Sequence, residues 1–376
     1  MKMNYNSSIY NLYYEWWKNI DKFIFSLIIL LFVTGLFFSL LSTSLLVSDK
    51  LDTNDYAFFF KHLSFVFLGL VIIFMLSSIN EEKLFKISPI IFIISLVFLF
   101  LVPIIGIEVN SARRWLDFNI LPRFQPIELV KPFLIILISL ILSNEKYPNI
   151  YFKYLFSFLI TLVIGLLLAA QPDIGQTLLV FFSWSVLIFI SGINVIFLVI
   201  SCLILSVALY FSINLIPKFA YIKNRILSFF NTETGTHNAQ SEKAIDSITS
   251  GGFFGKGIGE GTLKNRVPEA HTDYIISVIS EEFGVIAIIL ILLMFLVLIY
   301  SVFKKINLGN KERTKLVLVG CVSLILLQAM IHIGVNIRLF PTTGMTLPFI
   351  SYGGSSIISI SILSGIILNL TKRRVS

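Results

Sequence analysis

Charged residues are scarce in this sequence, and cysteine is almost absent. Asp, Glu, Lys and Arg make up 13% of the 376 residues, whereas hydrophobic residues make up 56% and the mean hydropathy is +0.91. A chain with so little charge cannot cover its apolar surface in water, which excludes a soluble protein and predicts an integral membrane protein. The two cysteines, Cys202 and Cys321, lie in separate apolar runs, which argues against a disulfide framework or a cysteine metal site.

The basic residues stand mainly at the ends of the apolar runs. The net charge is +8, a balance that nucleic-acid-binding proteins also have. Here the Lys and Arg residues flank membrane runs, where they orient the chain, so we exclude nucleic acid as a partner. The first apolar run starts near Phe23 and is long enough to span a bilayer, so we expect a retained helix rather than a cleaved signal.

Apolar runs long enough to span a bilayer occur about ten times along the chain. We therefore predict an all-α, polytopic membrane protein that forms one domain over residues 1–376. The predicted helices cover residues 23–47, 57–79, 84–107, 125–143, 154–170, 175–191, 194–216, 274–303, 316–336 and 345–370.

The short connections predict that both termini are cytoplasmic. Lys and Arg gather in the connections on the side of the termini, for example at Lys304, Lys305 and Lys311, and membrane proteins keep such residues in the cytoplasm. The long polar connection 217–273 then lies outside. Its glycine-spaced run, 251–261, lacks the Lys-Ser/Thr of a P-loop, so we expect backbone close to a substrate or partner rather than a nucleotide site.

Polar residues within the predicted helices point to a cavity that opens to the outside. Asp, Glu, Lys and Arg are expensive at membrane depth and mark a function by default. They occur only in the outer halves of the predicted helices, so we expect apolar packing to close the cavity below. The polar residues are Lys61, His62, Glu128, Lys131, Asp173, Glu281, Glu282, the stripe Gln328, His332 and Asn336, and Ser351 and Ser355 in the last predicted helix.

Asp273 begins the predicted helix 274–303 and has two readings. It could cap the helix by accepting a backbone N–H, which stabilises a helix by about 1 kcal/mol. Its neighbours Glu269, His271 and Thr272 crowd the same turn, which is more polar chemistry than one cap requires. A partly desolvated carboxylate beside His271 could act as a general base toward a sugar hydroxyl.

Four cations lie near the same outer surface: Arg113, Arg114, Arg123 and Lys131. Lys131 could pair with Glu128 at i, i+3, and the arginines could meet lipid phosphates. Guanidinium and ammonium groups together also suit a pyrophosphate leaving group. A divalent cation such as Mg²⁺ or Mn²⁺ could share that charge, but no residue cluster has convincing ligand spacing, so we assign no metal site.

Six motifs together resemble the SEDS (shape, elongation, division and sporulation) family of membrane proteins. They are ARRW at 112–115, RFQPIELVK at 123–131, QPDIGQT at 171–177, GGFFGKGIGEG at 251–261, PEAHTDYIISVISEEFG at 268–284 and LPFISYGGSS at 347–356. Their order and the helix layout fit the family over nearly the whole chain. Ala270 and the pair Phe349–Ile350 resemble its cell-division branch more than its elongation branch.

The resemblance implies a glycosyltransferase that polymerises lipid II into glycan strands on the outer face of the bacterial cytoplasmic membrane, at the division septum. The family's essential aspartate falls on Asp273, and its functional arginine and lysine fall on Arg123 and Lys131. Ile127 stands where the family has a small residue, which puts only a local contact in doubt. The other predicted substrate-binding residues are Glu128, Arg113, Arg114, Gln125, Asp173, His271, Thr272, Ser351 and Ser355.

The resemblance also implies partners and leaves two other functions open. The expected partners are lipid II, the nascent glycan strand, a class B penicillin-binding protein (the septal transpeptidase) and other division proteins. One alternative is a lipid II flippase, which should line its path with polar groups at all depths. The other is a non-enzymatic scaffold for the transpeptidase, which would not need a polar cavity.

Overall fold

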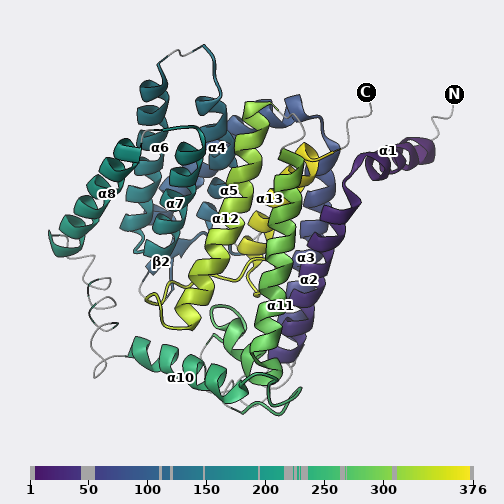
Figure 1. Cartoon of the computed structure of the whole chain (residues 1–376), viewed down its shortest axis with the longest axis vertical. Coiled ribbons are helices and arrows are strands. Elements are labelled where there is room, and N and C mark those ends of the chain that lie inside the picture. The colour runs from purple at the N-terminus through teal and green to yellow at the C-terminus, as the bar shows by residue number, and fades with distance from the viewer. Residues whose placement is uncertain are drawn as a thin grey trace.

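The computed structural model describes most of the chain as a helical bundle (Figure 1). The described residues are 5–43, 56–109, 112–118, 122–146, 149–193, 195–215, 223, 227, 229, 236–262, 267, 269–306 and 311–372. The helices are α1 (Tyr5–Asn19), α2 (Lys22–Thr43), α3 (Ala57–Ser78), α4 (Glu81–Ile105), α5 (Pro126–Leu142), α6 (Ile150–Ala170), α7 (Ile174–Ile190), α8 (Val195–Leu215), α10 (Thr236–Gly251), α11 (Ile275–Ile306), α12 (Glu312–Asn336) and α13 (Gly354–Leu370).

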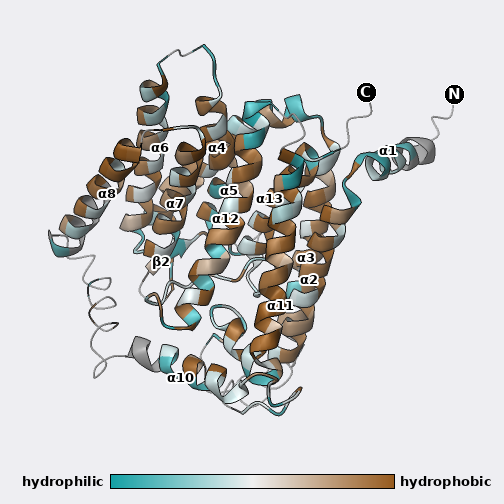
Figure 2. Ribbon diagram, in the orientation of Figure 1, coloured by the Kyte–Doolittle hydropathy of each residue, from teal (hydrophilic) through white to brown (hydrophobic). Residues whose placement is uncertain are grey.

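Each predicted helix overlaps one helix of the bundle, and six are long and apolar enough to cross a membrane. These six lie in α2, α3, α4, α6, α11 and α12, while apolar stretches in α7, α8 and α13 are shorter. Figure 2 shows the hydrophobic residues along the bundle helices and the hydrophilic ones mainly near the ends. The prediction of a multi-pass membrane protein is therefore confirmed, and the count of ten spans stays a prediction.

The fold departs from the predicted helices at four places. Helix α1 precedes the first predicted helix, in a segment for which no helix was predicted. Strands β1 (Ile107–Val109) and β2 (Ala112–Trp115) form an antiparallel pair, so the chain is mostly but not entirely helical. Helix α10 lies within the long predicted connection. Helix α13 begins at Gly354, nine residues after the predicted start, because Phe349 has φ 65° and Gly353 has φ 177° and ψ 97°, and neither conformation is helical.

The ends of several helices meet on the side of α1. Asp21 pairs with Lys305 at 2.6 Å, which joins the start of α2 to the end of α11. The Asn369 side chain, near the end of α13, donates to the main-chain oxygens of Leu76 and Ile79 at 2.7 Å each. The start of α2 and the ends of α11 and α13 are therefore on one face of the bundle, as the topology prediction requires. Its cytoplasmic assignment stays a prediction.

Helices α5, α12 and α13 form the centre of the bundle. In α12, 67% of the apolar stretch is buried, against 22% in α3, which faces outward. Helix α12 packs against α7 and α5, and α13 packs against α3 and α5. The polar residues of these central helices are therefore enclosed by protein and need protein partners.

Helix α11 bends at Gly284, and the glycine-spaced run packs against that bend. Gly284 has φ 73° and ψ −177°, a conformation essentially restricted to glycine. A methyl group added there would overlap the main-chain oxygen of Phe253. The main-chain oxygens of Glu281 and Glu282 accept from Lys256 N and Gly257 N. The run therefore packs on α11, and the expectation that its backbone lies close to a substrate or partner stays a prediction.

The two buried glutamates before the bend hold this loop rather than line a cavity. Glu281 accepts from Ser247 at 3.0 Å and pairs with Lys256 at 3.3 Å. Glu282 accepts from Gly259 N at 3.3 Å. Their cost of burial is offset by these partners, so they serve the packing of α10 and the loop on α11.

Gly284→Ala is expected to destabilise the protein more than Gly192→Ala. Both glycines have positive φ, but no atom lies within 4 Å of a methyl group added at Gly192. Gly192→Ala should therefore lower the free energy of unfolding only by the cost of a positive φ, about 1–2 kcal/mol. In Gly284→Ala the added methyl group also clashes with the main-chain oxygen of Phe253. Thermal unfolding in detergent measures the difference, and equal melting temperatures would contradict this account of the bend.

Candidate functional site

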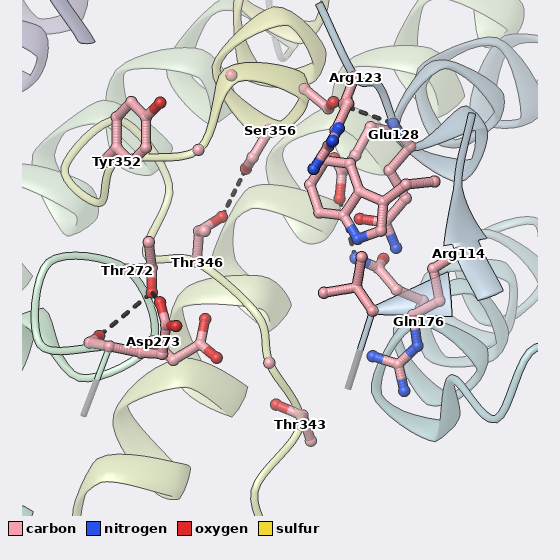
Figure 3. A pocket seen from close by; sticks show the side chains of 18 of the residues that line it. Arg114, Arg123, Glu128, Gln176, Thr272, Asp273, Thr343, Thr346, Tyr352 and Ser356 are labelled. Atoms are coloured by element: carbon pink, nitrogen blue, oxygen red, sulfur yellow. Dashed lines mark hydrogen bonds between the residues drawn. The ribbon is translucent and has the colours of Figure 1, made fainter. Parts of the chain in front are cut away.

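A polar cavity of about 1250 Å³ opens among the loops at the end of the bundle away from α1 (Figure 3). The turn before α11 forms one wall, and residues from β2 to the start of α5 form the other. The segment between α12 and α13 crosses between them. A cavity is therefore present, and chain segments far apart in the sequence build it. That it opens to the outside of the cell stays a prediction.

The turn Glu269–Tyr274 holds Asp273 in the first wall. The amides of Thr272, Asp273 and Tyr274 all donate to the main-chain oxygen of Glu269, which itself has φ 55°. Asn336 on α12 donates to the main-chain oxygen of Asp273 at 3.0 Å. Helix α11 begins only at Ile275. Asp273 thus sits in a bonded turn ahead of the helix, half-buried, with its side chain lining the cavity.

His271 lies in the same turn but does not line the cavity. Its ring packs against Phe58 and Tyr352, with ring centroids 5.2 and 6.1 Å away, and its Nε2 is 4.0 Å from a carboxylate oxygen of Glu269. Burial lowers the pKa of His271 below its ordinary value, and Glu269 opposes that shift. A neutral imidazole therefore supports the turn through packing.

Acidification is expected to destabilise the protein through His271. Because its pKa is lower in the folded state, the unfolded chain binds the proton first as the pH falls below about 6.5. The stabilisation is present above that pH and is lost as the pH falls through the folded pKa. The melting temperature of the wild type should drop more between pH 7.5 and 5.5 than that of His271→Gln, and an equal drop would contradict this.

Arg114 holds the opposite wall. Its Nε donates to the main-chain oxygen of Gln171 at 3.3 Å and lies 3.6 Å from Asp173, and its Nη2 donates to the main-chain oxygen of Pro172. Gln125 completes the link, because its side chain donates to Asp173 at 3.1 Å. Strand β2 thereby fixes a guanidinium at the edge of the cavity.

Gly344 lies between the two walls. A methyl group added at Gly344 would be 3.6 Å from Oδ2 of Asp273 and 3.8 Å from Nη1 of Arg114. The acidic and basic groups therefore face the same point from opposite sides, as Figure 3 shows. A group bound over Gly344 would contact both.

A buried ion pair forms the floor of the cavity. Lys131 is fully buried and donates to Glu128 at 2.8 Å and to Gln328 at 3.4 Å. Glu128 also accepts from Gln176 at 2.9 Å through the same oxygen. Gln328 in turn donates to the main-chain oxygen of Thr346 at 3.0 Å. The floor is therefore bonded to the segment that crosses the cavity.

The predicted site residues divide into those that line the cavity and those that do not. The lining ones are Asp273, Thr272, Arg114, Arg123, Gln125, Glu128 and Ser355. Arg123 pairs with Asp117 at 2.8 Å, and its side chain remains 65% exposed. Asp173 and Lys131 support lining residues from behind.

Ser351 is buried and accepts from Leu347 N. Arg113 points elsewhere and pairs with Glu108 at 3.5 Å.

Several lining residues were not predicted. The segment after α12 contributes Thr342, Thr343, Gly344 and Thr346, and Gln176 and Tyr352 add further polar groups. Lys61, which also lines the cavity, was already among the polar residues predicted there. Part of this segment was assigned to the last predicted helix because its mean hydropathy is high. The run of threonines around a glycine and the following Pro348 was the available signal for a polar loop.

A metal site is not evident in the part of the chain that the structure describes. No group of three or more His, Cys, Asp or Glu side chains there could hold an ion. The carboxylates of Glu269, Asp273 and Glu128 line different parts of the cavity wall. We derive no step through a metal ion.

Comparison with known proteins places the chain among relatives of similar length. It is 31% identical over 366 residues to the probable peptidoglycan glycosyltransferase FtsW of Caulobacter vibrioides, covering 96% of this chain and 91% of that one. It is 34% identical over 352 residues to the FtsW of Wigglesworthia glossinidia brevipalpis, which is also named a probable peptidoglycan glycosyltransferase, covering 90% of each chain.

Solved structures share the fold. A variant of the rod shape determining protein RodA of Thermus thermophilus superposes with a TM-score of 0.68 at 25% identity, covering 94% of this chain and 97% of that one. A chain from a peptidoglycan synthase complex superposes with a TM-score of 0.75 at 24% identity and the same coverage. The family model of the FtsW, RodA and SpoVE cell cycle proteins matches residues 21–375. The chain therefore belongs to the FtsW/RodA/SpoVE family of cell cycle proteins, which the motifs around Asp273 and Arg123 had indicated.

Proposed function

We propose that this protein is a peptidoglycan glycosyltransferase that polymerises lipid II into glycan strands, with Asp273 as the general base. The observation that carries the proposal is that the side chains of Asp273 and Arg114 both lie near one point above Gly344 in a polar cavity. The names of the relatives support the same activity. A carboxylate opposite a guanidinium suits a reaction in which a hydroxyl loses a proton while a phosphate gains charge.

In the proposed reaction a hydroxyl of the acceptor sugar attacks the anomeric carbon of the donor. A new carbon–oxygen bond forms, the bond from that carbon to the pyrophosphate oxygen breaks, and the pyrophosphate leaves with the electron pair. Asp273 takes the hydroxyl proton. Arg114, Arg123 and Lys61 line the cavity and supply positive charge for the leaving group. Lys131 acts from beneath, by holding Glu128 and Gln328.

The size of the cavity fits two sugar-phosphate groups. Its volume of about 1250 Å³ exceeds the range of roughly 300–1000 Å³ that is usual for small-molecule pockets. Donor and acceptor must both be present for the bond to form, and each carries sugars and a charged group. The lipid tails would remain in the surrounding bilayer.

The distribution of buried charge favours this activity over a flippase. Among the described residues, the buried side chains of Glu128, Lys131 and Asp173 belong to the cavity region. Those of Glu281 and Glu282 hold the glycine-spaced loop on α11, and Asp21 lies at the opposite end, where it pairs with Lys305. The apolar cluster of α5, α12 and α13 fills the bundle between them. A scaffold without activity would not need the cavity.

Polymerisation by the purified chain alone tests the proposal. The protein is incubated with fluorescent lipid II in detergent and the products are separated by length on a gel. We expect glycan strands of many units, and a purified, folded protein that makes none, alone or with a class B transpeptidase, would contradict the proposal. Appearance of lipid II across vesicles without polymer would favour the flippase instead.

Arg114→Lys is expected to lower kcat/KM for lipid II polymerisation by about tenfold or more. A lysine cannot bond the main-chain oxygens of Gln171 and Pro172 and present charge to the cavity at once. Arg113→Lys is the matched control, because its side chain pairs with Glu108 outside the cavity. Steady-state rates should leave Arg113→Lys within about twofold of the wild type, and equal losses would refute the assignment.

The family relationship also suggests a setting and a partner. We propose that the protein works in the bacterial cytoplasmic membrane at the division septum, together with a class B penicillin-binding protein. The FtsW names of the relatives support the division role, and the synthase complex whose chain shares this fold coordinates polymerization and crosslinking.

A further inference from the structure

The loop between α10 and the turn carries the most exposed aromatic side chains of the described chain. Phe254 is 83% exposed and Phe253 is 74% exposed, and Ile258 beside them is 62% exposed. We call these three residues the apolar tip. Neighbouring loop residues are glycines and charged side chains, so the apolar tip is a local feature and not part of a wider hydrophobic loop.

The backbone of the apolar tip is bonded to a defined level of α11. Val285 N donates to the main-chain oxygen of Gly252 at 3.0 Å, and Ile286 N donates to that of Phe253 at 3.4 Å. Gly284 allows this approach, as described above. The apolar tip therefore lies at the same height relative to the membrane as Val285 of α11.

The length of α11 places that level at the boundary of the hydrocarbon. Lys304 and Lys305 mark the end of α11 on the side of Asp21. From there to Val285 the helix has roughly 20 residues, or about 30 Å, which equals the hydrocarbon thickness of a typical bilayer. The bonded level thus coincides with the opposite hydrocarbon boundary.

Helix α2 gives a second estimate of the same depth. Its start is joined to Lys305 by Asp21, and Phe37 and Phe38 contact Phe283 with ring centroids 5.9 and 5.6 Å away. Phe37 lies roughly 15 residues, or about 23 Å, along α2 from Lys22. By this estimate the ring of Phe283, next to the bend, lies about 7 Å inside the boundary of a hydrocarbon layer about 30 Å thick.

We propose that the apolar tip inserts into the lipid leaflet on the side of the cavity and acts as a membrane anchor for the loop. The apolar tip contacts lipid rather than a protein, because an exposed apolar surface of α11 begins one turn below it and faces the bilayer. Ile289 and Leu290 on that surface are 50% and 56% exposed and lie within the apolar stretch. Aromatic and aliphatic side chains at this depth are typical of interfacial anchors.

Site-specific fluorescence in vesicles tests the proposal. A Cys202→Ala, Cys321→Ala background carries Phe254→Cys or, as a matched control, Glu260→Cys, an exposed polar position of the same loop. Each variant is labelled with bimane and reconstituted in vesicles of phosphatidylethanolamine and phosphatidylglycerol. Melting temperatures equal to that of the background confirm that both variants are folded.

Lipids with a nitroxide near the carbonyl group should quench the label at position 254 at least about threefold more than at 260. Aqueous iodide should show the opposite order. Equal lipid quenching at the two positions, or stronger iodide quenching at 254, would overturn the proposal. Shielding of position 254 from iodide that occurs only after a class B transpeptidase is added would also overturn it, because the occupant would then be a protein.

Discussion

Asp273→Asn is expected to lower kcat for lipid II polymerisation by about 10²–10⁴-fold, the usual contribution of a general base. The amide keeps the shape of the carboxylate but cannot accept the hydroxyl proton at neutral pH. The main-chain oxygen of residue 273 still accepts from the Asn336 side chain, and its main-chain N–H still donates to the main-chain oxygen of Glu269. The turn should therefore persist. Single-turnover rates with labelled lipid II separate this loss from weaker binding.

Glu260→Gln is the control for Asp273→Asn. Glu260 is also a carboxylate of the long connection, but it is exposed and does not line the cavity. Its rate should stay within about twofold of the wild type, as expected for an exposed surface charge. If Asp273→Asn retains full activity while its melting temperature is unchanged, Asp273 has no part in proton transfer.

Lys131→Met is expected to destabilise the folded protein by about 3–5 kcal/mol. Lys131 and Glu128 are both buried, and removal of the ammonium leaves the carboxylate with the Gln176 amide as its hydrogen-bond donor in the cavity floor. An uncompensated buried charge costs more than the pair itself contributes. Thermal unfolding in detergent at constant lipid content measures the loss.

The double variant Glu128→Gln, Lys131→Met separates charge from packing. Because it removes both charges, its melting temperature should lie above that of Lys131→Met alone. Additive losses in the cycle would contradict a direct pair. Activity should remain low even where stability recovers, because Gln328 loses its hydrogen bond from Lys131. Gln328 is then no longer fixed in the position from which it donates to the main-chain oxygen of Thr346 in the cavity.

Helix positions were predictable because hydropathy is a local property. The ranges 57–79 and 316–336 differ from α3 and α12 by a few residues, since each apolar run must stay in the bilayer whatever its neighbours do. The start of α13 was missed for the opposite reason. The hydropathy averaged over this segment is high because it includes Met345, Leu347 and Phe349. In the structure Thr346 donates to Ser356 and Ser351 accepts from Leu347 N, and these bonds hold the segment as a loop.

The sequence predicted which residues belong to the site, but not the direction in which each side chain points. Arg113 and Arg114 are adjacent in the sequence and chemically alike. In strand β2 they point in different directions, one toward Glu108 and the other toward Asp173. Glu281 was a candidate for the cavity because it is a carboxylate in the outer half of a predicted membrane helix, yet it faces Ser247 and Lys256.

The amino-acid sequence alone determined that this chain crosses a membrane many times, that it belongs among the SEDS proteins, and that Asp273 and Arg123 lie at its polar end. Those conclusions depend on composition and on motifs, which are read one segment at a time. That Asp273 faces Arg114 across Gly344, and that Lys131 lies beneath the cavity, could be learned only from the folded protein. The reason is that side-chain partners come from α5, α7, α12 and the loops between them, and such long-range packing has no local signal in the chain.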